Sequence, residues 1–125
     1  MGSSSSSSIT NDRGRFAADW HRGNETTCFN DTGKYTETLI VPEAVGFIKR
    51  MAHQPAQATK PFFLYLPFQN IHGPYTTQQQ YFDMYANKSF TPGEQTMFGY
   101  LTELDFAVGT IVAALKKTGA WENSV

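Results

Sequence analysis

The sequence predicts an α/β fold, and three segments carry that prediction. Residues 62–68 form an apolar run, a helical pattern begins at Pro42, and a longer helical pattern follows Thr91. An uncharged run of this length is typical of a strand buried on both faces, as in a parallel sheet covered by helices. The order helix, strand, helix therefore predicts a central, mostly parallel sheet flanked by helices.

Length and composition are those of one domain or of part of a larger one. The chain has 125 residues, of which 40% are hydrophobic and 17% are charged, and its formal net charge is −1. So small a net charge favours neither nucleic acid nor an anionic membrane surface as a partner. The chain contains no uninterrupted apolar run near the ~20 residues that cross a bilayer, so we expect no membrane span.

The N-terminal residues 1–13 include a run of serines that cannot bury apolar surface. We expect a disordered leader or a remnant of cloning there, followed by a partial domain over residues 14–125. The leader has neither the cationic start nor the apolar stretch of a secretory signal, so no signal peptide is predicted. Sequons of the form N-x-[ST] begin at Asn24, Asn30 and Asn87, and as glycosylation candidates they hint at secretion.

The first helix is predicted to start at Pro42. The preceding segment, KYTETLIV, is rich in β-branched and aromatic residues and predicts a short strand or an extended approach to the helix. Proline suits the first turn of a helix, where its missing N–H has no partner to lose. Apolar residues then recur at helical spacing as far as Ala52, and Lys49 and Arg50 complement the helix dipole near its end.

The strand predicted for residues 62–68 ends near Pro67, because proline cannot donate to a ladder. Residues 69–90 follow as a loop with one short helical turn around residues 78–84. The aromatic side chains of this loop have two interpretations. They stack on the sugar rings of a substrate, or they pack the loop onto the domain, which we favour. They are Tyr75, Tyr81, Phe82 and Tyr85.

The clearest helix signal begins at Thr91. The stretch Thr91-Pro-Gly-Glu94 has the capping-box pattern, with a threonine N-cap, proline at N1 and glutamate at N3. A periodic apolar pattern continues to residue 118, and Gly119 is placed to end the helix in a left-handed conformation. Such a helix needs a sheet to bury its apolar face, yet only one convincing buried strand is present. We therefore expect the chain to be a fragment of a larger α/β domain.

Two stretches, FFLYLPFQNIHGPY and GYLTELDFAVGTIVAALKKTGAWENSV, resemble a sulfatase. The likeness is to the arylsulfatase B-like branch, whose type member is the N-acetylgalactosamine 4-sulfatase. In that branch a strand of the form F-L-Y-L-x-x-Q-x-x-H-x-P leads into the active site, and a helix carrying D-x-A-V-G follows it. Residues 105–109 and 119–124 match the helix and its end. The upstream stretch GKYTETLIVPEAVGFIKR resembles a further family segment, so the likeness covers residues 30–125.

The resemblance implies an alkaline-phosphatase-like α/β domain that hydrolyses sulfate esters, with sulfated glycans as one substrate class. It also implies a calcium ion and a formylglycine nucleophile made from the cysteine of C-x-P-S-R. Cys28 lies in TCFND, which lacks the proline and the Ser-Arg pair, so it is not that nucleophile. The metal-binding Asp-Asp and D-N-G-G segments would precede and follow this stretch. We therefore expect no cofactor-binding or metal-binding residues here, an inactive fragment, and a complete protein that is secreted or lysosomal.

His72 matches the family's histidine after the strand, and it is the candidate catalytic residue. Ligands of open α/β sheets bind beyond the carboxyl ends of strands, where His72 is expected to lie. An imidazole there can hydrogen-bond a sulfate oxygen and stabilise charge on the leaving group. The alternative is a loop histidine satisfied by neighbouring backbone. His21 and His53 flank polar loops and are interpreted as surface residues.

The remaining polar residues have simpler interpretations. Gln69 and Asn70 either line the site or satisfy the turn backbone. Glu103 and Asp105 are two positions apart, so they do not share a helix face and form no acid/base pair. Cys28 either pairs with a cysteine elsewhere in the complete protein or is an inert free thiol. Two rival functions stay open: a noncatalytic fragment or pseudo-enzyme acting as a structural or binding module, and a related hydrolase acting on phosphate.

Overall fold

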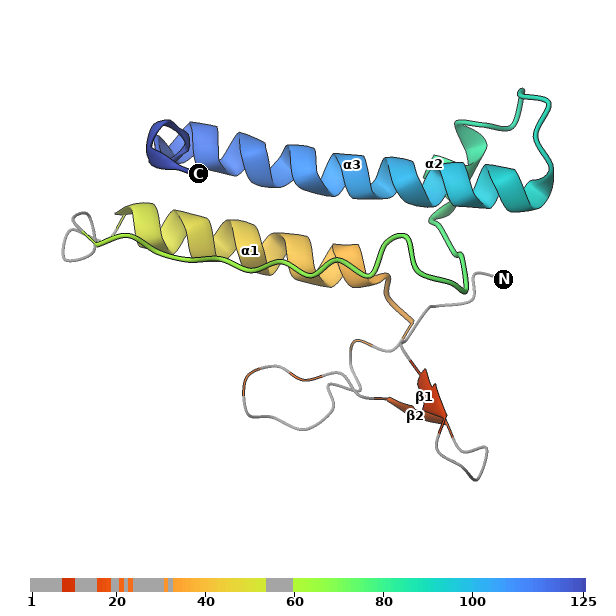
Figure 1. Ribbon diagram of the computed structural model, residues 1–125, viewed down its shortest axis with the longest axis horizontal. Helices are drawn as coiled ribbons and strands as arrows, with labels where there is room; N and C mark the ends of the chain where they lie inside the picture. Colours follow the sequence, from red (N-terminus) through yellow and green to blue (C-terminus); the bar gives the residue numbers. More distant parts are fainter. Residues whose placement is uncertain are drawn as a thin grey trace.

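Two long helices and one extended segment organise the structure, a computed structural model that describes residues 8–10, 16–18, 21, 23, 31, 33–53 and 60–125. Helices α1 (Thr36–His53) and α3 (Pro92–Thr118) lie side by side and run in the same direction (Figure 1). Residues 60–68 run beside them in the opposite direction, which is the relation of a strand to its flanking helices in an α/β unit.

The shorter elements lie around this pair. Helix α2 (Gln79–Asp83) packs on α3, and the 3₁₀ turn η2 (Trp121–Asn123) follows its end. Strands β1 (Ser8–Thr10) and β2 (Phe16–Ala18) form a two-stranded antiparallel sheet. Strand β1 lies within the predicted leader, and the boundary after residue 13 stays a prediction.

Helix α1 begins earlier than the sequence predicts. The strand or extended approach expected for KYTETLIV is wrong, since Thr36–Val41 form the first turns of α1 and Pro42 lies inside the helix. Tertiary hydrogen bonds explain the difference. The Tyr35 hydroxyl donates to the carbonyl of Thr77 at 2.8 Å, and the Thr36 hydroxyl donates to Gln69 Oε1 at 2.8 Å. These contacts outweigh a weak local β preference, and Pro42 is exposed, so its ring meets solvent rather than the core.

The predicted strand at residues 62–68 is extended, but it pairs with no other strand in the part of the chain that the structure describes. Its side chains alternate: Leu64 and Leu66 pack against the core, whereas Phe63 and Tyr65 are 88% and 74% exposed. The expectation of burial on both faces, and of a central parallel sheet within the described residues, is therefore wrong. A sheet ladder needs neighbouring strands to satisfy its backbone groups, and the described residues place none beside this segment.

The predictions for α2 and α3 are confirmed. The Thr91 backbone N–H donates to Glu94 Oε2 at 2.8 Å, and the Glu94 N–H donates to Thr91 Oγ1 at 3.3 Å, which completes the capping box. Gly119 ends α3 with φ +75°, a conformation that an L side chain disfavours. The short helical turn expected around residues 78–84 is α2. Local signals therefore set both ends of the longest helix.

The core lies between α1 and α3. Ala44 and Ile48 of α1 are buried against Ile111 and Ala114 of α3, and Leu64, Leu66 and other half-buried aliphatic side chains surround them. Small side chains at the contact allow the two helix backbones to approach closely. The same contact aligns the N-terminal turns of α1 with the first half of α3, and the candidate site lies at that end.

By length and composition alone, α3 is apolar enough to cross a membrane. Core helices of soluble proteins have the same properties, and a single such helix is weak evidence. The absence of a membrane span stays a prediction.

Gly99 allows α2 and the loop before it to lie directly on α3. A Cβ atom at Gly99 would lie 2.8 Å from Thr77 Cγ2 and 3.1 Å from the Tyr81 carbonyl carbon. The Tyr81 contact is with backbone, so relief would require α2 to shift. We therefore expect Gly99→Ala to lower the free energy of unfolding by about 1–3 kcal/mol, as overpacking does. Urea unfolding of the 125-residue chain measures this change.

Gly109→Ala is the matched control, because it lies on the same helix and a Cβ atom added there would meet nothing within 4 Å. Alanine favours a helix over glycine by about 1 kcal/mol, so this control should stabilise the chain. Equal stabilisation by both substitutions would contradict the close approach at Gly99.

Candidate functional site

His72 lies on an exposed turn at the carboxyl end of the extended segment. Its backbone N–H donates to the Gln69 carbonyl at 2.9 Å, and its Nδ1 lies 2.7 Å from the Gly73 carbonyl oxygen. A carbonyl only accepts, so this contact assigns a proton to Nδ1 and leaves Nε2 directed elsewhere. The neutral ring thus offers an acceptor at Nε2, and the cationic ring offers a donor there. The cationic ring can therefore donate a hydrogen bond from Nε2 to an anion.

Side chains at the two ends of the turn fasten it to the helices. At the first end, the Thr36 hydroxyl donates to Gln69 Oε1 at 2.8 Å, and Asn70 Nδ2 donates to the Tyr100 carbonyl at 3.1 Å. The side chains of Gln69 and Asn70 therefore hydrogen-bond to the two long helices rather than to the turn backbone, and their role in lining the site stays a prediction. At the second end, the Tyr35 hydroxyl donates to the Thr77 carbonyl at 2.8 Å. Residues 71–75, between these ends, are exposed, whereas Thr76 is half-buried.

Two buried carboxylates lie beneath this turn, one on each long helix. Glu37 is 5% exposed and Glu103 is 2% exposed. Gln78 Nε2 donates to Glu103 Oε1 at 2.5 Å, and the Thr77 hydroxyl donates to Glu103 Oε2 at 3.3 Å. Glu37 Oε1 is buried without a hydrogen-bond partner among the described residues, as are Asn70 Oδ1 and Thr76 Oγ1.

Burial raises the pKa of both carboxyls, since it penalises the charged form. Hydrogen bonds from Gln78 and Thr77 oppose the rise in the pKa of Glu103, whereas the negative charge of Glu103 adds to the rise in the pKa of Glu37. Burial and the same two charges raise the pKa of Tyr100 to about 12. The two acids therefore interact electrostatically across the α1–α3 contact.

Sequence reasoning missed this pair. The prediction that Glu103 and Asp105 do not act together agrees with the structure, since Glu103 is buried and Asp105 is exposed. The acidic neighbour of Glu103 is instead Glu37, more than sixty positions away in the sequence. Local spacing holds no sign of that pairing. The only available signal was an acidic residue beside apolar positions of the helix, such as Leu104.

The other two histidines are surface residues, and Tyr85 of the aromatic loop packs on α3. His53 is exposed at the end of α1, with its Nδ1 2.7 Å from the Lys49 carbonyl oxygen, and His21 is also exposed. Tyr85 stacks on Phe98 and hydrogen-bonds with Thr102 at 2.6 Å, so it packs the loop onto α3.

Tyr75 differs from those packed aromatics, because it is 51% exposed and lies on the same turn as His72. Asn87 is exposed in the turn after α2. Asn24, Asn30 and Cys28 lie outside the described residues, so their predicted roles stay predictions.

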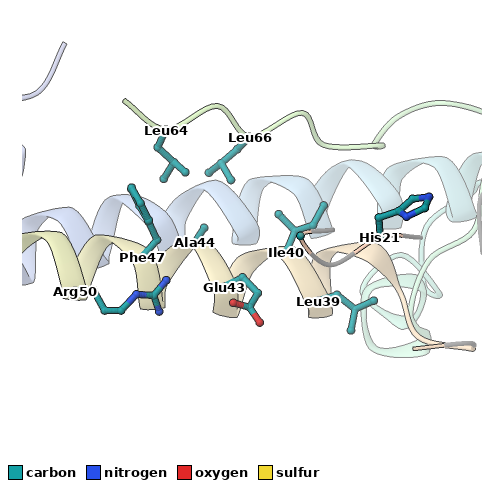
Figure 2. Close-up of a pocket in the computed structure, with 10 residues that line it drawn as sticks. His21, Leu39, Ile40, Glu43, Ala44, Phe47, Arg50, Leu64 and Leu66 are labelled. Atoms are coloured by element: carbon teal, nitrogen blue, oxygen red, sulfur yellow. The ribbon is translucent and has the colours of Figure 1, made fainter. Parts of the chain in front are cut away.

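The structure also holds a hollow of about 420 Å³ between α1 and the extended segment (Figure 2). Its wall is mostly apolar, with the Glu43 and Arg50 side chains among its polar groups. No residue of the His72 turn lines it. The lining residues are His21, Gly23, Leu39, Ile40, Glu43, Ala44, Phe47, Arg50, Leu64 and Leu66.

The described residues do not fit a catalytic metal. No group of three His, Cys, Asp or Glu residues in that part of the chain lies close enough to hold a metal ion. The sequence also has no C-x-P-S-R motif from which a formylglycine is made. No step through a metal or a formylglycine therefore follows from these residues.

Comparison with known proteins identifies the family. The sulfatase family model matches residues 6–125, so the chain belongs to the sulfatase family. This confirms the resemblance, and membership implies an alkaline-phosphatase-like α/β fold. One relative is arylsulfatase J of Mus musculus, which is 33% identical over 95 residues. The match covers 76% of this chain and 15% of that relative. No solved structure matches the chain.

The raised pKa values of Glu37 and Glu103 predict how stability depends on pH. A carboxyl whose pKa is higher in the folded state than in the unfolded state favours folding while it is protonated. That contribution is complete below the unfolded pKa of 4.5 and is lost as pH rises through the raised folded value. We expect Glu37→Gln, which is neutral at every pH, to be more stable than the wild type at pH 7 by about 1 kcal/mol.

Urea unfolding of both chains between pH 4 and pH 8 measures this difference, which should grow as pH rises. Comparison with the wild type removes contributions of opposite sign, such as that of Glu94, whose pKa is lowered by hydrogen bonds from Thr91. Glu122→Gln changes an exposed carboxylate and serves as the control. A Glu37→Gln advantage that is constant with pH would contradict the prediction.

Proposed function

We propose that this chain is a segment of an arylsulfatase-type enzyme that hydrolyses sulfate esters, and that His72 contacts the sulfate group. The observation that carries the proposal is the family match over residues 6–125. The position of His72 adds to it, because the residue follows the extended segment and lies on an exposed turn. That is the side of an α/β sheet on which ligands bind.

The chemistry proposed for His72 follows from its hydrogen bonding. With Nδ1 donating to the Gly73 carbonyl, the imidazolium form has one remaining N–H, at Nε2. That group can donate to a sulfate oxygen or to the oxygen of the leaving alcohol as negative charge develops there. A metal ion and a formylglycine, which the family generally uses, would come from residues outside this chain; we propose calcium as the metal.

Sulfated glycans are the substrate class that we propose for the complete enzyme. Tyr75 supports this choice, since its ring is 51% exposed and lies three positions from His72, whereas Tyr85 is held by stacking on Phe98. An aromatic face beside an anion-binding group suits a sulfated sugar.

A noncatalytic role is the second candidate, and one observation favours it. Within the described residues, no group of three His, Cys, Asp or Glu side chains lies close enough to hold the metal ion that the family generally uses. A pseudo-enzyme would keep the fold and the turn as a structural or binding module.

We also propose that the complete protein is secreted or lysosomal and that Asn87 carries an N-glycan. The sequon Asn87-Lys-Ser89 lies in an exposed turn, as glycosylation requires. Expression of the complete protein in a eukaryotic secretory host tests this. Asn87→Gln should remove one glycan's mass, and an unchanged mass would refute the assignment.

His72→Ala tests the catalytic proposal in the sulfatase that contains this segment. Loss of a donor aimed at transition-state charge typically lowers the rate by about 10²–10³-fold. Loss of a surface side chain usually changes stability by no more than about 0.5 kcal/mol. We therefore expect kcat/KM on an aryl sulfate to fall steeply while the melting temperature stays nearly constant. Turnover of the matching aryl phosphate distinguishes a phosphate hydrolase.

His53→Ala is the control, because it also removes an exposed histidine whose Nδ1 contacts a backbone carbonyl. Equal activity of the two variants would make His72 an ordinary turn residue.

The 125-residue chain alone is expected to have no sulfatase activity and no specific calcium binding. The nucleophile motif is absent from its sequence, and its described carboxylates are not grouped as oxygen ligands. Aryl sulfate turnover and calorimetric titration with calcium measure both properties. Turnover above that of a heat-denatured sample, or saturable binding at micromolar calcium, would overturn this expectation.

A further inference from the structure

The turn that carries His72 is fixed at both ends, and residues 71–75 between them are exposed. Its first end is held by the Thr36 hydroxyl of α1, which donates to Gln69, and by the Tyr100 carbonyl of α3, which accepts from Asn70. Its second end, at Thr77 and Gln78, is held by two side-chain hydrogen bonds that converge on Glu103. The Tyr35 hydroxyl also donates to the backbone carbonyl of Thr77. Because residues 71–75 are exposed, the position of His72 depends largely on these two ends.

Glu103 is the acceptor that organises the second end. Each of its carboxylate oxygens accepts a hydrogen bond from one side chain of the loop. Oε1 accepts from Gln78 Nε2 at 2.5 Å, and Oε2 accepts from the Thr77 hydroxyl at 3.3 Å. Hydrogen bonds to a charged acceptor are roughly twice as strong as neutral ones. In the described part of the chain, Glu37 is the one other carboxylate that is comparably buried.

Burial alone does not require a carboxylate at this position. An apolar side chain of similar volume is often neutral or stabilising where it replaces a buried charge. Glu103 is 2% exposed, whereas His72 is exposed, so the Glu103 carboxylate has no direct access to a substrate held at the surface. What an apolar residue would lose is the pair of acceptors for Thr77 and Gln78.

We infer that Glu103 is a positioning residue, which fixes the loop at Thr77 and Gln78 so that His72 is held ready to meet the sulfate ester. The inference rests on the role proposed above for His72. Glu103 acts through the loop and takes no part in bond making or proton transfer.

Glu103→Met separates positioning from packing, because methionine fills a similar volume without offering an acceptor to the loop. In the 125-residue chain we expect the melting temperature to stay equal or to rise. Amide hydrogen exchange of peptides covering residues 69–78, followed by mass spectrometry, should become about tenfold faster or more, since two hydrogen bonds to a charge are lost.

Glu103→Gln is the conservative variant, because its amide oxygen still accepts from Gln78 and its amide group can donate to Thr77. It should retain most of the loop protection, and Glu122→Gln should match the wild type. If Glu103→Met does not fold, Thr77→Val combined with Gln78→Leu removes the same hydrogen bonds from the loop side and should give the same faster exchange. Unchanged exchange over residues 69–78 in a folded variant lacking these bonds would overturn the inference.

A double-mutant cycle in the sulfatase that contains this segment tests the link to catalysis. Glu103→Met should lower kcat/KM on an aryl sulfate by about tenfold, which one strong hydrogen bond can account for. In the His72→Ala background the same substitution should have almost no further effect. Full additivity of the two changes would overturn the inference. If His72→Ala alone has no effect, the proposed function fails, whereas the exchange experiment still decides whether Glu103 holds the loop.

Discussion

The close contact between α1 and α3 is the constraint on which the rest of this structure depends. Ala44 and Ala114 keep the two helices near each other, and Ile48 and Ile111 fill the space between them. Full burial of such aliphatic side chains contributes about 1.5–3 kcal/mol each. Since the helices run in the same direction, their N-terminal halves end up together (Figure 1). That arrangement brings Glu37 and Glu103, far apart in sequence, to one end of the core.

A polar loop can dock on this end because the helices present matching groups there. Tyr35 and Thr36 donate to the loop, whereas Glu103 and the Tyr100 carbonyl accept from it. Buried polar atoms cost free energy unless they are hydrogen-bonded, so these contacts fix one position of the loop rather than many. The apolar contact thus supplies stability, and the polar contacts supply the geometry of the turn that carries His72.

Features determined by neighbours in sequence could be predicted, and features determined by distant residues could not. The capping box at Thr91, the glycine that ends α3 and the short helix α2 depend on nearby residues, and each is observed. The early start of α1 depends on Thr36 meeting Gln69, more than thirty positions away. The buried state of Glu103 depends in the same way on donors from a separate loop.

In the extended segment at residues 60–68, the local conformation could be predicted from the sequence, but the pairing with other strands could not. Its sequence is that of a strand, and its alternating exposure is that of a strand packed on one face. Pairing requires partners, which the described residues do not provide. Strand pairing is therefore an interaction between segments, and the pattern within this segment alone does not determine it.

Several large apolar side chains are exposed in the described part of the chain, and membership of the sulfatase family offers a reason. Phe63 and Tyr65 on the extended segment, and Leu101, Phe106 and Val108 on α3, are each at least 44% exposed. Exposed apolar side chains of this size are available for contact with other protein segments. The chain spans 15% of the length of arylsulfatase J, and in a complete sulfatase domain further strands and helices are available to cover them. We infer that a sheet would continue at the unpaired backbone edges of residues 60–68 and that other segments would cover Phe63 and Tyr65. The His72 turn would then lie at the carboxyl end of that strand.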